Sequence, residues 1–170
     1  SLLWLTACGV PLSTNSNVGQ EIDVTKPIDV ALLVPGASSR ETDNQLAQNF
    51  ENAARLAIAD LEGAKINLRV YNTAGGNPQQ AAAAATQAVN DGAKIILGPL
   101  FGEAANAAGV AIAGRDVNVM AFSNNTAFAG GNVFILGATF QNTASRLVQY
   151  GSRRGINRYL VLHGDDLAGA

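Results

Sequence analysis

The stretch from residue 94 to residue 125 places the tightest constraint on the fold of this chain. It contains two short apolar runs, at 95–97 and 117–122, and each run stops at turn-forming residues. A segment of small residues with helical character, 103–114, lies between them. A strand, a helix and a second strand in this length are typical of a βαβ unit with parallel strands. The stretch therefore predicts an α/β fold, with any ligand site beyond the carboxyl ends of the strands.

The same alternation of strands and helices continues over most of the chain. Apolar runs predict further buried strands at 28–34, 133–136 and 159–162, and an alternating pattern at 66–71 predicts a half-exposed strand near a sheet edge. With 48% hydrophobic and only 14% charged residues, the composition fits a sheet covered by helices on both faces. We therefore expect an α/β fold with a doubly wound, mostly parallel sheet.

Helical spacing of apolar residues predicts the helices between these strands. In the first helix, the expected buried face consists of Leu46, Phe50, Ala53, Ala57 and Leu61. Asn77 and Pro78 provide a cap and a first-turn proline for the next helix, over 81–89, and a last helix is expected at 141–154.

The rhythm breaks near residue 137, which suggests two lobes. We expect an N-terminal α/β lobe at 28–138 and the first helix and strand of a second α/β lobe at 139–170. The chain begins with Ser1 rather than Met and stops soon after an expected strand. Both features indicate a fragment of a longer protein, truncated at both ends.

The N-terminus has the pattern of a secreted lipoprotein. Residues 1–8 are apolar and look like the end of a signal peptide, and 5–9 resemble a bacterial lipobox whose Cys8 would carry a lipid. The alternative is a buried free cysteine in an apolar N-terminal segment. Residues 9–27 are rich in Ser, Thr, Asn, Gly and Pro and are expected to form a flexible tether.

Most enzyme classes lack support in this sequence. It contains neither a phosphate-binding GxxxxGK[ST] loop nor a strand-linked GxGxxG, and no cluster with metal-ligand spacing. The serine-containing turn at 36–40 lacks the second glycine of a nucleophile elbow, and His163 is the only histidine. We expect no catalytic residue, cofactor or metal. A net charge of −2 without a basic stripe gives no support to nucleic-acid binding.

Five segments together resemble the type I periplasmic binding proteins of the Leu/Ile/Val-binding group. They are the strand at 29–35, the turn and alanine-rich helix from 71, the segments 95–99 and 119–123, and the segment 154–166. This resemblance implies two α/β lobes with a ligand cleft between them, and a non-enzymatic binding function.

Within that group, the segments 98–103 and 121–125 on a lipobox-bearing chain are most similar to the penicillin-binding protein activators. That resemblance implies a periplasmic lipoprotein, anchored through Cys8 to the outer membrane, that regulates peptidoglycan synthesis by activating a penicillin-binding protein. The alternative is a solute-binding receptor of an ABC transporter for branched-chain or other amino acids, whose partner is a small polar ligand.

Candidate ligand-binding residues lie in the two loops that follow the strands of the opening stretch. They are Pro99, Leu100, Phe101, Gly102, Ser123, Asn124 and Asn125. Amino-acid receptors of this group tend to carry a hydroxyl residue near the position of Gly102, where this chain has glycine followed by Glu103. The glutamate would oppose a carboxylate at the helix start. Ser and Asn at 123–125 are also explained by simple turn formation.

Overall fold

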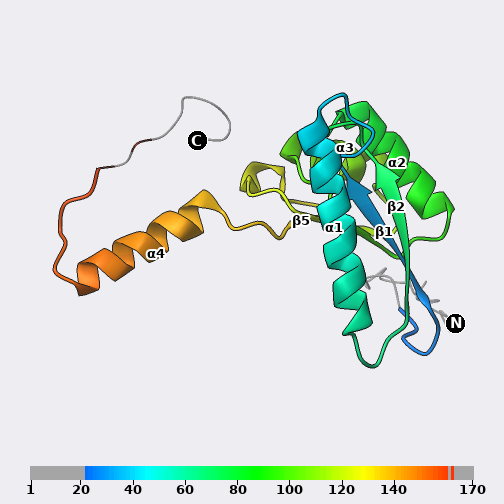
Figure 1. Ribbon diagram of the computed structural model, residues 1–170, viewed down its shortest axis with the longest axis horizontal. Coiled ribbons are helices and arrows are strands. Elements are labelled where there is room, and N and C mark those ends of the chain that lie inside the picture. Colours follow the sequence, from blue (N-terminus) through cyan, green and yellow to red (C-terminus); the bar gives the residue numbers. More distant parts are fainter. Residues whose placement is uncertain (1–21, 161, 163–170) are drawn as a thin grey trace, which may run out of the picture.

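The computed structural model describes residues 22–160 and 162 (Figure 1). Its elements are β1 (Ile28–Val34), α1 (Glu41–Ala59), β2 (Ile66–Asn72), α2 (Pro78–Asn90), β3 (Ile95–Leu97), α3 (Gly102–Ala111), β4 (Asn118–Ala121), the 3-10 turn η1 (Thr126–Phe128), β5 (Val133–Ile135) and α4 (Phe140–Arg153). The expected cap is present, because the Asn77 side chain accepts a hydrogen bond from the backbone N–H of Gln80 at the start of α2.

The five strands form one parallel sheet in the order β2-β1-β3-β4-β5. The edge position expected for residues 66–71 is confirmed, because β2 pairs only with β1 among the described strands. Since all strands run the same way, the loops that follow them meet at one edge of the sheet.

Helices cover both faces of the sheet, so the doubly wound α/β fold is confirmed. Successive side chains of β1 point to opposite faces: Ala31 and Leu33 join the core beneath α2 and α3, whereas Leu32 and Val34 join the core beneath α1. Alanines dominate the first core, and this allows α2 and α3 to approach the strands closely.

The buried face of α1 differs from the expected one. Ala47, Phe50 and Ala54 pack against the sheet, while Leu46 is 40% exposed and Leu61 lies beyond the helix end. Apolar residues are spread around this helix, so their spacing did not identify a single face. The sheet decides the face, because Phe50 stacks on Phe122 with ring centroids 4.8 Å apart and planes 6° from parallel.

The C-terminal segment is separate from the sheet. In Figure 1, α4 lies apart from the five strands, and its residues 140–150 are all exposed. The prediction of a strand at 159–162 is wrong for the residues that the structure describes there, because positions 159, 160 and 162 have no strand conformation. A strand requires hydrogen-bond partners on a neighbouring strand, and none of the five strands pairs with this segment.

The predictions for Cys8 and for most of the tether concern residues outside those that the structure describes. Within the part of the chain that the structure describes, no helix is long and apolar enough to cross a membrane. The domain boundary near 138 stays a prediction.

Candidate functional site

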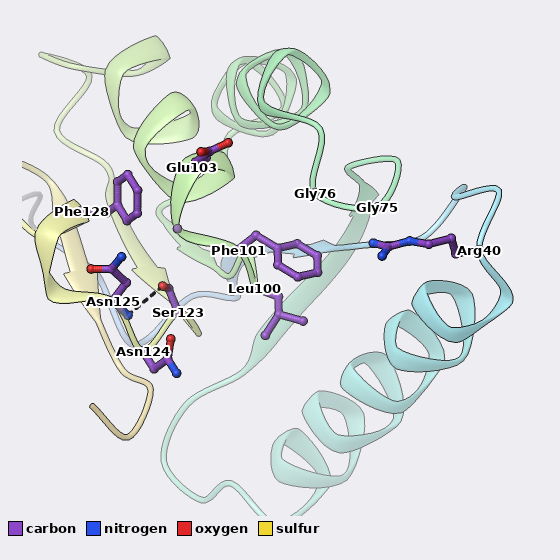
Figure 2. Close-up of a pocket in the computed structure, with 11 residues that line it drawn as sticks. Arg40, Gly75, Gly76, Leu100, Phe101, Glu103, Ser123, Asn124, Asn125 and Phe128 are labelled. Carbon is purple, nitrogen blue, oxygen red and sulfur yellow. Dashed lines mark hydrogen bonds between the residues drawn. The ribbon is translucent and has the colours of Figure 1, made fainter. Parts of the chain in front are cut away.

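A pocket of about 390 Å³ lies at the carboxyl edge of the sheet (Figure 2). Loops after β1, β2, β3 and β4 contribute to it. Its lining residues are Arg40, Gly75, Gly76, Leu100, Phe101, Gly102, Glu103, Ser123, Asn124, Asn125 and Phe128. The parallel arrangement explains this convergence, because four strand ends place their loops at the same edge.

Six of the seven predicted binding residues line this pocket, and Pro99 does not. Pro99 is fully buried, and its carbonyl accepts a hydrogen bond from the N–H of Phe122 (3.0 Å). Gly98 likewise donates to the carbonyl of Met120 (2.8 Å). Pro99 therefore ties the β3 loop to the β4 loop below the pocket and contributes no surface to it.

Two aromatic rings form the apolar wall, and each ring packs against a glycine. A Cβ atom at Gly76 would overlap the ring of Phe101, and a Cβ at Gly102 would overlap the ring of Phe128. The second contact explains the missing hydroxyl at position 102: the space that such a side chain would enter holds an aromatic ring.

The polar wall comes from the loop after β4. Ser123 is only 4% exposed, and its Oγ accepts a hydrogen bond from the N–H of Asn125 (3.1 Å). Among the described residues, no acceptor takes the hydroxyl hydrogen of Ser123, which leaves this group able to donate into the pocket. Asn124 is exposed beside it.

Asn125 has a clear structural role. Its Oδ1 accepts from the N–H of Ala127 (2.9 Å) and caps η1. Turn formation therefore accounts for Asn125, as the alternative explanation of 123–125 anticipated. Turn formation explains why the Oγ of Ser123 accepts a hydrogen bond, but it does not explain the hydroxyl hydrogen, which no described acceptor takes.

Five lining residues were absent from the predicted set: Arg40, Gly75, Gly76, Glu103 and Phe128. Arg40 follows β1, and the two glycines follow β2. The rule that points to loops after parallel strands applies equally to those two strands, and its wider use would have identified them. Phe128 had no such signal, because it belongs to the short turn η1 rather than to a recognisable strand end.

The pocket contains charged and polar groups but no metal cluster. Within residues 22–160 and 162, no group of three or more His, Cys, Asp or Glu residues could hold a metal ion. The arrangement offers hydrogen-bond donors, one cation, one anion and two aromatic faces, which suits non-covalent binding of a small organic molecule.

Comparison with known proteins identifies the family. Residues 27–170 match the model of the periplasmic binding protein family. The chain belongs to this family. An uncharacterised protein of Rickettsia prowazekii, RP748, is 24% identical over 149 residues, which is 88% of this chain and 38% of that protein.

Solved structures of binding proteins share this fold. A solute-binding protein of Rhodopseudomonas palustris in complex with 3,4-dihydroxybenzoic acid superposes with a TM-score of 0.64 at 19% identity, covering 84% of this chain and 40% of that one. The leucine-binding protein of Thermotoga maritima gives a TM-score of 0.58 at 14% identity, covering 75% and 37%. The chain thus spans about two fifths of the length of these relatives.

These matches confirm the resemblance to type I periplasmic binding proteins and the fold of one lobe. Members of this periplasmic binding protein family are binding proteins, and membership indicates a periplasmic location. The resemblance to the penicillin-binding protein activators has no counterpart among these matches.

Proposed function

We propose that this chain forms the ligand-binding first lobe of a solute receptor of an ABC transporter. The observation that carries the proposal is the pocket at the carboxyl edge of the sheet, where the buried Ser123 keeps an unused hydroxyl donor. Family membership and the solute-binding relatives support this function over penicillin-binding protein activation.

The proposal includes a second lobe that begins at about residue 139. In α4, Leu147 is 65% exposed, Val148 44% and Tyr150 58%. Apolar side chains in such a helix are normally buried against a sheet. The part of the chain that the structure describes supplies no sheet for them. A second lobe would cover them and would close over the pocket from the opposite side.

Two kinds of ligand are worth testing first. The Rhodopseudomonas palustris relatives were solved with 3,4-dihydroxybenzoic acid and 4-hydroxybenzoate, and the Thermotoga maritima relative is a leucine-binding protein. All three compounds are small carboxylates with an apolar body. The aromatic wall of Phe101 and Phe128 suits a planar or branched apolar body.

Activation of a penicillin-binding protein is the second candidate. It is favoured by the absence of a hydroxyl side chain at Gly102 and by the acidic Glu103 that follows. It includes lipidation of Cys8 and an anchor at the periplasmic face of the outer membrane. The membrane would then be contacted only through the lipid.

A thermal-shift panel on the full-length protein separates the two candidates. A receptor given one of these carboxylates at 100 times its dissociation constant should gain about 2.7 kcal/mol of stability. Ser123→Ala should reduce the affinity roughly fivefold to tenfold, because it removes one hydrogen bond worth about 1 kcal/mol. Thr42→Ala, which removes a hydroxyl at an exposed position of α1 outside the pocket, is the matched control and should bind normally.

The opposite outcome is equally specific. If no compound of the panel stabilises the protein, and a penicillin-binding protein is captured from membrane extract by the wild type, the receptor proposal fails in favour of the activator.

A further inference from the structure

Arg40 stands at the rim of the pocket in a fixed orientation. Its Nε donates to Oδ2 of Asp43 at 2.9 Å, its Nη2 forms an ion pair with the same oxygen at 2.9 Å, and its backbone N–H donates to Oγ of Ser38 at 3.1 Å. Figure 2 shows the guanidinium directed from the β1–α1 loop toward Phe101. Among the described residues no acceptor holds Nη1, so this part of the guanidinium remains available to a ligand.

The carboxylate that orients Arg40 is deeply buried. Asp43 is 3% exposed, and its Oδ2 also accepts the hydroxyl of Ser38 at 2.7 Å. A Cβ at Gly75 would come within 2.8 Å of both groups, so the neighbouring turn confines them. An arginine fixed in this way loses less side-chain entropy when it binds an anion than a free one would.

The other charged group of the pocket is placed to repel anions from the opposite side. Glu103 lies in the first turn of α3, where the free N–H groups of the helix would otherwise attract a ligand carboxylate. Arg40 is the one positively charged residue among those that line the pocket, and Figure 2 shows it on the far side of Phe101 from Glu103. A ligand carboxylate is therefore attracted on the Arg40 side and repelled at the start of α3.

We propose that Arg40 is the residue that selects the ligand, by receiving its carboxylate at the β1–α1 side of the pocket rather than at the start of α3. This inference rests on the proposed receptor function. The apolar body of the ligand then lies between Phe101 and Phe128, and the hydroxyl of Ser123 remains for a second polar group.

Paired acids and amides test this selection in the full-length protein. The probes are L-leucine with L-leucinamide, and 4-hydroxybenzoate with 4-hydroxybenzamide, measured by isothermal titration calorimetry. In the wild type, the acid of the binding pair should be preferred at least tenfold over its amide. Arg40→Gln should remove most of this preference by weakening the acid, while the affinity for the amide stays within about twofold.

A matched control exists on α1, the helix that follows Arg40. Arg55 of α1 pairs with Glu51 at 2.7 Å, is similarly exposed and does not line the pocket. Arg55→Gln should leave both affinities and the acid preference unchanged. Arg40→Lys should keep part of the preference, because the charge remains but the planar fork is lost.

The outcomes distinguish the two levels of the proposal. Suppose that an acid binds, and that Arg40→Gln either lowers the affinities for the acid and the amide equally or changes neither affinity. The proposed role of Arg40 is then wrong, and the receptor function stands. If the Arg55→Gln control loses the acid preference as well, the effect belongs to general charge and the role of Arg40 is again wrong. If none of the four probes binds to the wild type, this inference falls together with the receptor function for these ligand classes.

Discussion

The two halves of the sheet are held together by different interactions. On the β1–β2 half, side chains form ion pairs and hydrogen bonds: Arg40 with Asp43, and Arg69 with Asp29 at 3.3 Å. Tyr71 donates its hydroxyl to Asp91 at 2.9 Å. The four ion pairs found in the described part of the chain all involve residues before position 70.

The β3–β5 half relies on close backbone approach instead. Gly137 donates to the carbonyl of Ser123 at 3.1 Å, and a Cβ there would overlap that carbonyl oxygen. Gly98 is confined in the same way by the carbonyl oxygen of Leu33, whereas Gly102 meets the side-chain ring of Phe128. The difference implies that the first half should respond to pH and salt, whereas a methyl group added at Gly98 or Gly137 of the second half should meet backbone atoms.

Gly137→Ala should give the largest effect. The new methyl group would meet backbone atoms, including the carbonyl oxygen of Phe122 at 2.7 Å, and these cannot move aside as a side chain can. We expect a loss of about 2–3 kcal/mol in the free energy of unfolding, measured by urea denaturation. Gly114→Ala is the control: its φ is +76° but nothing lies within 4 Å, so only about 1 kcal/mol of backbone strain is expected. Equal losses in both variants would contradict the volume explanation.

Gly102→Ala should have a smaller effect on stability, because its obstacle is the ring of Phe128, which can rotate. We expect about 1 kcal/mol of destabilisation, together with weaker ligand binding as the ring moves into the pocket. In a Phe128→Ala background the same substitution should cost almost nothing. A double-mutant cycle on stability and binding measures this coupling, and additive effects would show that the ring and the glycine are independent.

Tyr71→Phe should have the smallest effect at neutral pH and a distinct one in alkali. Burial, then the hydrogen bond and the charge of Asp91, raise the pKa of the Tyr71 hydroxyl above its ordinary value of 10.0. The folded state therefore holds this proton more tightly than the unfolded state. The stability that it contributes is fully present below about pH 10 and is lost as the pH rises through the folded-state pKa.

Urea denaturation at several pH values checks this prediction. The variant should be less stable than the wild type by roughly 0.5 kcal/mol at pH 8, the lower end for an exposed hydrogen bond, and the gap should narrow above pH 10. A gap that stays constant or widens in alkali would contradict the assigned direction of the pKa shift. Gly137→Ala, on the other half, should show a gap that does not change over this range.

Local sequence patterns determined the elements and their order. Apolar runs bounded by turns located β1, β3, β4 and β5 closely, because buried parallel strands need continuous apolar sequence. An alternating pattern located β2, which lies at the edge of the sheet. Asn77 and Pro78 marked the start of α2 through capping chemistry that acts within four residues. The parallel sheet then placed a candidate site at the carboxyl ends of β3 and β4, where six of the predicted residues do line a pocket.

Only the tertiary structure decided which side chains meet. The buried face of α1 depends on Phe122, a residue more than 70 positions away from Phe50 in the chain. Phe128 enters the pocket because the fold brings the turn η1 beside the loop that follows β3. Residues 159, 160 and 162 show that a local pattern is not enough to form a strand. Their apolar pattern is that of a strand, but hydrogen bonding to a neighbouring strand makes a strand, and a local pattern cannot provide that partner.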